Sequence, residues 1–377
     1  MAGSRRRAGP TLALALLLAA SAGCALLRPD PARVAPLVAD AGRLVLVGFH
    51  GTAAEANADV DRLVCQARVA GIVLFGRNIV DRDQVARLTR ALQARARDCG
   101  HGPLLIAVDA EGGQVMRLGP AAGYTPTLSA AELGSGGDVT LTELEARRIG
   151  AMLREAGIGW NLAPVVDVGY NPANPVIVGV GRAFSANPVL VTAHARAFIR
   201  GMRAEGILTA VKHFPGHGSS LADSHHGFVD VTWTANPDLE LAPYRALIAE
   251  GLVDAVMTAH VFNRFLDVWY PATLSPATIE GLLRRDLGWR GLVVSDDLRM
   301  AAIERHWGLE AAAVLALRAG VDLLLVADDR LPDGGSAAAR VIGAVRQALA
   351  DGRLAPERVA EALERVRALA ARARPGR

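Results

Sequence analysis

Residues 208–226 of this 377-residue chain read LTAVKHFPGHGSSLADSHH. The first seven residues form a largely apolar run that has Lys212 and His213 just before its last residue, Phe214, and a segment rich in Gly, Ser and His follows it. A continuous apolar run of this length is typical of a parallel strand whose two faces are both covered. The stretch therefore predicts a buried strand over Leu208–Phe214 that leads into a polar loop.

The same alternation of short apolar strands and amphipathic helices extends from residue 43 to residue 371. The other strand candidates are Leu44–Phe49, Gly71–Phe75, Leu104–Asp109, Gly159–Pro164, Asp254–His260, Gly291–Asp296 and Asp322–Ala327. The helical patterns cover Val60–Val69, Val85–Ala96, Glu143–Ala156, Val189–Ala204, Ala242–Glu250, Pro276–Leu287, Leu309–Ala319, Ala337–Ala350 and Pro356–Ala371. Eight βα units in roughly 310 residues predict a single-domain (β/α)8 barrel of the TIM type. A doubly wound sheet is the alternative, but no Gly-rich phosphate turn follows the first strand.

Polar side chains lie at or just beyond the carboxyl ends of five of the eight predicted strands. They are Asp109, Asn161 with Asp167, Lys212 with His213, His260, and Asp296 with Asp297. Active sites of (β/α)8 barrels lie at the carboxyl ends of the strands. Since single Asp and Asn residues are common in turns, one polar strand end means little, but five together predict a catalytic site.

The charge composition argues against a nucleic-acid partner. The chain has 41 basic and 38 acidic residues, and Arg5, Arg6 and Arg7 account for the whole excess. Without residues 1–23 the two signs balance, so no basic surface is expected. Lys212 is the only lysine, which suggests a position where a compact ammonium does what an arginine cannot.

The N-terminus has the pattern of an export signal. Basic Arg5–Arg7 precede the apolar run Thr11–Ala20, and small residues then lead to Cys24. This resembles a bacterial lipoprotein signal, although Ser21 stands where that pattern prefers Leu. We expect a signal peptide over residues 1–23, lipidation of Cys24, a tether over residues 24–42 and the domain over 43–377. The protein would then be exported and anchored to a membrane, facing the periplasm from the outer membrane. Ordinary cleavage near Ala22, or an uncleaved anchor, is the alternative.

The remaining cysteines and the histidines do not suggest a metal site. Cys65 and Cys99 both lie in helical patterns, so two buried thiols are expected, although an exported location also permits a disulfide. No Cys/His spacing resembles a zinc site. The histidines of the loop after Leu208–Phe214 share no fixed helical face, so we expect neither a metal nor a cofactor.

The loop and four other segments resemble the β-N-acetylhexosaminidase branch of glycoside hydrolase family 3. The strongest match is KHFPGHG followed by DSH, within Lys212–His225. The others are VDAEGGQVMR (Val108–Arg117), NLAPVVD (Asn161–Asp167), GRAF (Gly181–Phe184) and SDDLRM (Ser295–Met300). GRAF departs from the family's GRSF at Ala183. The stretch His226–Val229 departs further, which affects the expectation for the loop and for the neighbouring subsite.

The resemblance implies a role for each matching residue. Asp296 would be the nucleophile, His225 the general acid/base, and Asp223 the partner that orients His225. The terminal N-acetylglucosamine would be bound by Asp109, Arg117, Arg182, Lys212 and His213. The family has a (β/α)8 barrel and needs no metal. Asp167, His260 and Asn161 would support the site, or, for His260, belong to the core.

The physical chemistry of these residue types agrees with such roles. Retaining hydrolysis of a glycoside needs a carboxylate nucleophile and a group that first gives and then takes a proton. The ordinary pKa of histidine, about 6.5, suits that second role near neutral pH. Because Asp296 and Asp297 are adjacent, only one would face the substrate if both lay on a strand. A simpler interpretation is that ion pairs explain Lys212, Arg117 and Arg182. Either sugar stacking or core packing would explain Trp160, Trp233 and Trp269.

The sequence thus predicts a retaining exo-β-N-acetylglucosaminidase that acts on peptidoglycan fragments or chitooligosaccharides. A family 3 β-glucosidase or an N-acetylglucosaminide phosphorylase is the alternative within the family. The complete DSH segment argues against the β-glucosidase branch, which takes its acid/base from another domain. A non-catalytic wall-binding lipoprotein is the alternative outside enzymes, since barrels host many functions. The expected partners are a carbohydrate substrate and a membrane; the sequence does not predict an oligomeric state.

Overall fold

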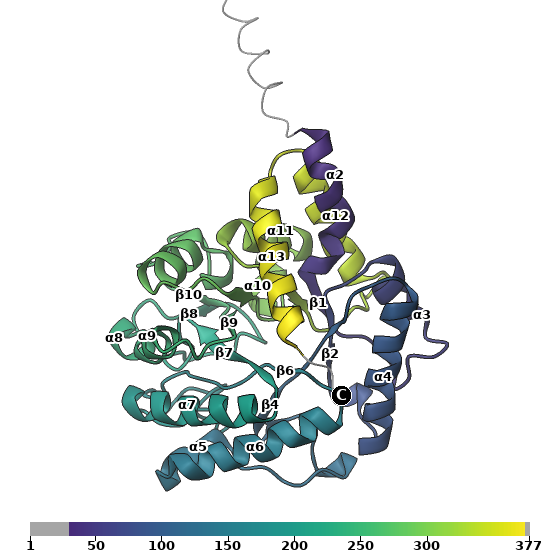
Figure 1. Cartoon of the computed structure of the whole chain (residues 1–377). Coiled ribbons are helices and arrows are strands. Elements are labelled where there is room, and N and C mark those ends of the chain that lie inside the picture. Colours follow the sequence, from purple (N-terminus) through teal and green to yellow (C-terminus); the bar gives the residue numbers. More distant parts are fainter. Residues whose placement is uncertain (1–29, 374–377) are drawn as a thin grey trace, which may run out of the picture.

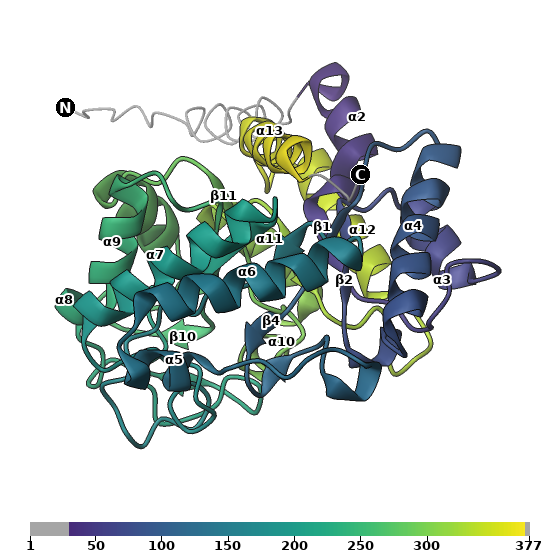
Figure 2. The same ribbon diagram turned by 60° about the horizontal axis from the view of Figure 1, so that its bottom comes forward.

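The computed structural model describes residues 30–373 and contains a ring of parallel strands surrounded by helices (Figures 1 and 2). The strands of the ring are β1 (Val45–Val47), β2 (Gly71–Leu74), β3 (Leu105–Val108), β6 (Trp160–Asn161), β7 (Leu208–Phe214), β9 (Ala255–Thr258), β11 (Leu292–Val294) and β12 (Leu324–Val326). Each predicted strand contains one of these. Their order in the sheet is β11-β9-β7-β6-β3-β2-β1-β12.

The register closes the sheet on itself. β1 pairs in parallel with β12, with Val45 opposite Leu324. A parallel bridge between Val294 and Leu323 joins the two ends of the strand order. The expected (β/α)8 barrel is confirmed, and because β1 and β12 pair, both ends of the described chain belong to one domain.

Helices follow the strands in the expected order. They are α3 (Ala58–Val60) with the π-helical η3 (Asp61–Gln66), α4 (Arg82–Asp98), α5 (Ala130–Gly136), α6 (Val139–Glu155), α7 (Pro188–Ala204), α8 (Pro237–Glu240), α9 (Ala242–Ala249), η7 (Ala277–Asp286), α10 (Ala301–Trp307), α11 (Leu309–Ala319), α12 (Ala337–Ala350) and α13 (Pro356–Arg372). Side-chain caps define several starts: Asp81 accepts from the Gln84 N–H before α4, and Asn187 caps α7 with Pro188 in its first turn.

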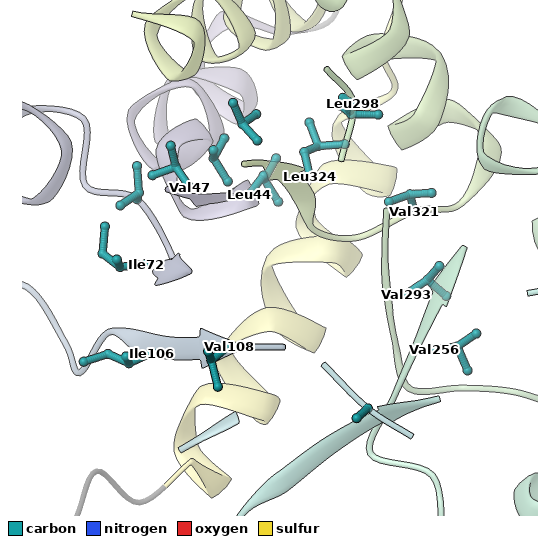
Figure 3. Close-up of a cluster of buried hydrophobic side chains, with 14 of the residues drawn as sticks. Leu44, Val47, Ile72, Ile106, Val108, Val256, Val293, Leu298, Val321 and Leu324 are labelled. Carbon is teal, nitrogen blue, oxygen red and sulfur yellow. The ribbon is translucent and has the colours of Figure 1, made fainter. Parts of the chain in front are cut away.

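Alternate residues of each strand point into two apolar layers. Ile72 and Leu74 of β2 pack outward beneath the helices, and Figure 3 shows part of this layer. Val73 of the same strand points into the barrel. There it belongs to the same cluster as Val366 and Leu369 of α13, so the last helix covers the amino-terminal end of the barrel. Asp254 at the start of β9, paired with Arg203 and Arg372, lies at that end.

Two small sheets lie beyond the strands of the barrel. β4 (Ala110–Gly112) and β5 (Val115–Met116) form an antiparallel pair after β3. β8 (Val229–Asp230) and β10 (Val261–Phe262) form a parallel pair after β7 and β9. Figure 2 shows β4, β10 and α10 on the side of the barrel opposite α13. The loops at the carboxyl ends of the strands therefore carry additional ordered structure.

The segment before β1 differs from the expected tether. Helix α2 (Pro31–Asp40) begins at the cap Asp30, and η2 (Ala41–Leu44) continues it into the core. Val34 is buried, and Arg33 pairs with Glu357 of α13 at 2.9 Å. The prolines of this segment suggested a linker, but Pro31 stands in the first turn, where proline is compatible with a helix. The predicted signal peptide and Cys24 lie outside the described residues.

The two cysteines are joined rather than free. A disulfide links Cys65 of η3 to Cys99 at the end of α4, with Cα atoms 5.3 Å apart. The expectation of two buried thiols is therefore wrong, and the pairing ties the helices that follow β1 and β2. Within residues 30–373, no helix is both long and apolar enough to cross a membrane.

Candidate active site

A cavity of about 320 Å³ lies among the residues that follow the barrel strands. Its size lies in the range of small-molecule sites. Its polar lining includes Asp109, Glu111, Arg117, Arg182, Lys212, His213, His217, Ser224, His225, Asp296 and Asp297. The apolar part of its lining includes Phe75, Met257 and Met300. Seven of the eight residues assigned to catalysis or sugar binding thus border one cavity, and the eighth, Asp223, contacts His225.

Asp296 lies two residues beyond β11 with its carboxylate in the cavity. Its Oδ1 accepts a 2.8 Å hydrogen bond from the Asp297 backbone N–H. Burial alone would raise the pKa of Asp296, but the nearby imidazoles of His260 and His213, together with that N–H, lower it to about 2. Asp296 is therefore ionised at neutral pH, as a nucleophile requires.

Asp297 has a different environment although it is the next residue. Its Oδ1 accepts hydrogen bonds from the backbone N–H groups of Ala327 and Arg299, at 2.9 and 3.1 Å. Burial raises its pKa to about 6. Because β11 ends at Val294, strand alternation does not extend to these two residues, and both border the cavity. The assignment of Asp296 rather than Asp297 to the substrate therefore stays a prediction.

The predicted dyad is formed. His225 Nδ1 lies 2.6 Å from Asp223 Oδ1, and the same oxygen accepts the His225 backbone N–H at 2.9 Å. Burial alone would raise the pKa of Asp223, but its contacts with His225 outweigh that effect and lower it. With Nδ1–H directed to Asp223, Nε2 is the ring nitrogen left for proton transfer. The arrangement matches the way a carboxylate orients the histidine of a catalytic triad.

The loop that carries the dyad is held at several points. His217 is buried between two hydroxyls, with Nδ1 2.7 Å from Ser220 Oγ and Nε2 3.1 Å from Ser224 Oγ. Burial lowers the pKa of His217 to about 4, so the ring is neutral at pH 7. The backbone of Gly218 runs so close to the Val168 carbonyl that a Cβ would lie 2.0 Å from its oxygen. The polar loop predicted after Leu208–Phe214 is thus fixed to the barrel at its base.

The far side of that loop contacts the helix that follows Asp296. The Ala302 N–H of α10 donates to the Ser224 carbonyl at 3.2 Å. The Phe228 ring lies 5.4 Å, between centroids, from both His306 of α10 and Phe262 of β10. Through α10, the segment of the nucleophile and the segment of the acid/base are therefore joined. The departure at His226–Val229 places an aromatic anchor here.

The predicted sugar-binding residues form one buried charge network. Lys212 Nζ lies 2.8 Å from Asp109 and 2.6 Å from Glu111. Arg182 donates to both carboxylate oxygens of Glu111 at 2.8 Å and lies 3.2 Å from His213 Nε2. Lys212 and Arg182 are thus ion-paired and also border the cavity, and their contact with a sugar stays a prediction. The adjacent cations outweigh burial and keep the pKa of Glu111 below its usual range.

The remaining predicted residues are placed as follows. Arg117 is half-exposed, with its guanidinium 3.8 Å from Asp109 Oδ2 and 6.0 Å from the centre of the Phe75 ring. His213 Nδ1 lies 2.7 Å from Asp167, which therefore orients it. His260 is buried with both ring nitrogens satisfied, by Thr273 and by the Asp297 carbonyl. Asn161 clamps the backbone of Ala110.

Several residues of the site were not predicted. Glu111 lies within the VDAEGGQVMR match, so a signal for it existed, but nothing in the sequence indicated its pairing with Arg182, which is 71 residues away. His217 belongs to the KHFPGHG match, but its hydroxyl partners depend on the folded loop. Among the tryptophans, Trp160 is core, whereas Trp233 and Trp269 are exposed. Within residues 30–373, no group of His, Cys, Asp or Glu side chains is arranged to hold a metal ion.

Comparison with protein families gives one match over most of the chain. Residues 37–369 match the model described as the Glycosyl hydrolase family 3 N terminal domain. The beta-hexosaminidase of Stenotrophomonas maltophilia (strain R551-3) is 39% identical over 301 residues, which cover 77% of this chain and 85% of that protein. The Beta-hexosaminidase A of Pseudoalteromonas piscicida is 36% identical over 71% of this chain. The matched segment covers 47% of the Pseudoalteromonas protein, so this chain spans about half the length of that relative.

Solved structures give the same result. The family 3 beta-N-acetylglucosaminidase of Paenibacillus sp. str. FPU-7 superposes with a TM-score of 0.83 at 41% identity, over 89% of this chain and 62% of that one. The beta-N-acetylhexosaminidase of Beutenbergia cavernae DSM 12333 superposes with a TM-score of 0.80 at 34% identity, over 89% and 98%. One of these relatives therefore extends well beyond the shared barrel, and the other is the barrel almost alone.

Proposed function

The chain belongs to glycosyl hydrolase family 3, and we propose that it is a retaining exo-β-N-acetylglucosaminidase that removes a non-reducing terminal N-acetylglucosamine. The observation that carries this proposal is the pairing of an ionised Asp296 with the Asp223–His225 dyad around one cavity. Retaining hydrolysis needs a nucleophile and a proton-transfer group, and these residues supply both.

The first step forms a covalent intermediate. An Asp296 carboxylate oxygen attacks C1 of the terminal sugar, and the bond between C1 and the glycosidic oxygen breaks. Protonated His225 gives its Nε2 proton to the departing oxygen, while Asp223 holds Nδ1–H and stabilises the imidazolium beforehand. The sugar is now joined to Asp296 and His225 is neutral, so it is ready to act as a base.

The second step returns the enzyme to its starting state. His225 takes a proton from a water molecule, and the water oxygen attacks C1 from the face that the leaving group occupied. The bond to Asp296 breaks, and N-acetylglucosamine leaves with its original β configuration. Lys212, Asp109, Arg182 and His213 already have fixed positions at the cavity, so little ordering is needed when the sugar hydroxyls bind.

The test compares an aryl β-N-acetylglucosaminide with the matching β-glucoside, with and without phosphate. We expect strong preference for the N-acetyl sugar, no need for phosphate, and loss of activity in Asp296→Ala and His225→Ala. The matched control is Leu221→Ala, because Leu221 is an exposed side chain of the same loop and is not assigned to the reaction. Preference for the glucoside, turnover that requires phosphate, or full activity of Asp296→Ala would each overturn the proposal.

The natural substrates and location are part of the same proposal. We propose peptidoglycan fragments or chitooligosaccharides as substrates, and export with lipidation at Cys24. The Cys65–Cys99 disulfide supports export, because disulfides persist in oxidising compartments. Metabolic labelling with palmitate tests the anchor: incorporation lost in Cys24→Ala, but kept in Cys65→Ala, supports it. A soluble, unlabelled wild-type protein contradicts it.

A further inference from the structure

A group of exposed aromatic and apolar side chains lies outside the cavity. Trp233 is 80% exposed, Trp269 77%, Phe265 66% and Val268 61%. Together these four residues are called the aromatic patch. Large aromatic side chains are usually buried for most of their area, and exposed apolar groups of this kind mark interaction sites. The proposed reaction uses none of the four.

The fold brings the patch together from two loops. Trp233 follows β8 and the other three residues follow β10, and β8 and β10 pair with Val229 opposite Val261. The Arg264 N–H donates to Thr232 Oγ1 at 3.1 Å, so the two loops are bonded to each other. The Trp233 and Phe265 rings meet edge to face, with centroids 5.2 Å apart. Trp233 and Phe265 are therefore in contact across the two loops, and Val268 and Trp269 follow Phe265 on the second loop.

Local hydrogen bonds hold the backbone that carries the exposed rings. The Asn263 carbonyl accepts from the N–H groups of Leu266 and Asp267. Asp267 Oδ1 in turn accepts the Trp269 N–H at 2.8 Å and the Tyr270 N–H at 3.1 Å. The backbone beneath the aromatic patch is thus fixed while its rings stay in solvent. A preorganised aromatic surface loses little conformational entropy when a ligand binds.

The aromatic patch lies at the end of the barrel that holds the cavity. β8 begins four residues after His225, and Phe228 between them packs against Phe262 of β10. Figure 2 places β10 with β4 and α10, opposite α13. The Phe228–Phe262 contact thus joins the acid/base loop to β10, the strand that precedes Phe265. The aromatic patch and the cavity therefore lie at the same end of the barrel.

The position of α2 argues against a membrane as the occupant. α2 contacts α13, at the opposite end of the barrel, through the pairs Arg33–Glu357 and Asp40–Arg367. Cys24 and the cap Asp30 are only six positions apart, a span of about 20 Å when fully extended. A lipid on Cys24 would therefore keep the amino-terminal end of the barrel near the membrane and the patch away from it.

We propose that Trp233, Phe265 and Trp269 form a surface site for chains of β-1,4-linked N-acetylated hexosamines, separate from the cavity that holds the cleaved sugar. Sugar rings have apolar C–H faces that stack on aromatic rings, and the indole N–H remains free to donate to a hydroxyl or an acetamido oxygen. The proposal rests on the proposed function, because it takes the ligand to be the remainder of the substrate. The site raises the affinity for long chains and not for single sugars.

The binding test is independent of catalysis because it uses the full chain with Asp296→Ala. The probes are the β-1,4-linked hexamer of N-acetylglucosamine and the free monosaccharide, measured by calorimetry. We expect Trp233→Ala with Trp269→Ala to weaken hexamer binding about ten-fold and to change monosaccharide binding less than two-fold. The matched control is Val189→Ala, which removes an equally exposed apolar side chain on α7.

A second measurement uses the active enzyme. We expect the double tryptophan variant to raise the KM for the hexamer several-fold more than the KM for the aryl N-acetylglucosaminide. Hexamer affinity equal to that of the Val189→Ala control overturns the proposal. Two other results, found in place of hexamer binding, would also overturn it. One is binding of the patch to phosphatidylglycerol vesicles, and the other is a dimer that the two tryptophan substitutions dissociate. If the wild type fails to cleave the aryl substrate but the patch binds the hexamer, the proposed reaction fails and the surface site stands.

Discussion

The Arg182 guanidinium donates to both carboxylate oxygens of Glu111, each at 2.8 Å. Lys212 lies 2.6 Å from the same carboxylate, and all three side chains are almost fully buried. Two cations therefore share the Glu111 carboxylate beside the cavity. Asp109, which is ion-paired with Lys212, supplies the second negative charge. Glu111 thus fixes the positions of the two cations that are assigned to the sugar.

Glu111→Gln should lower kcat/KM for the aryl N-acetylglucosaminide by about 10- to 100-fold. The variant keeps the shape of the side chain but leaves two buried cations with less negative charge, and unpaired buried charges are costly. Kinetics and thermal unfolding of the purified variant check this. Glu132→Gln is the control, because that carboxylate is exposed and contacts only its own helix start. Unaltered kinetics in Glu111→Gln would show that the network does not position the sugar.

The barrel could be predicted because its signal is local. Each buried strand is a short apolar run, and each helix has its own period, so the order of elements follows from the sequence without knowledge of contacts. Helices Leu309–Ala319 and Ala337–Ala350 match their predicted bounds. The predicted strand over Gly291–Asp296 is too long by two residues at its end, because the chain turns before Asp296 to place that carboxylate in the cavity.

The parts that could not be predicted depend on contacts between distant residues. The periodicity of two helices does not reveal that Cys65 and Cys99 meet. The sequence of α2 resembles a proline-rich linker, and its contacts with α12 and α13 appear only in the folded chain. The Val38 carbonyl, for example, accepts a hydrogen bond from Arg346. The pairing of Glu111 with Arg182 likewise exists only once strands β3 and β6 lie side by side. Motif resemblance pointed to residues that border one cavity, but not to the groups that hold them.

Phe228→Ala should lower kcat about five- to ten-fold with a smaller change in KM. The ring anchors the dyad loop against α10 and β10, and a small displacement of His225 weakens proton transfer more than sugar binding. Steady-state kinetics on the aryl substrate measure both constants, and Phe228→Tyr should restore most of kcat. Leu221→Ala, an exposed side chain of the same loop, is the control. An equal loss in Phe228→Tyr would argue against the anchoring role.

Reducing the Cys65–Cys99 bond should destabilise the barrel without touching the cavity. The cysteines are 34 positions apart, and closing a loop of that length contributes about 4 kcal/mol in the chain-entropy account. The double variant Cys65→Ser, Cys99→Ser should therefore unfold at a lower temperature than the wild type and should be insensitive to dithiothreitol. The wild type with dithiothreitol should match it. Equal melting temperatures in the reduced and oxidised wild type would mean that the bond does not form.

The wild type should lose stability as the pH rises from about 4.5 to 7, and Glu240→Gln should abolish that loss. The Glu240 carboxyl lies against Gly216, below the dyad loop, faces Tyr170, Ser219, Tyr244 and Asp167, and has Oε1 buried without a hydrogen-bond partner. Burial raises the pKa of Glu240 to about 7. Between about pH 4.5 and pH 7 this carboxyl is therefore protonated in the folded state and ionised in the unfolded state. The stabilisation is complete below pH 4.5, falls as the pH rises, and is gone above pH 7, a change of about 3 kcal/mol. Urea unfolding of both proteins at pH 5 and pH 8 measures it. The variant should gain stability relative to the wild type at pH 8, and a difference that does not depend on pH would contradict the assignment to Glu240.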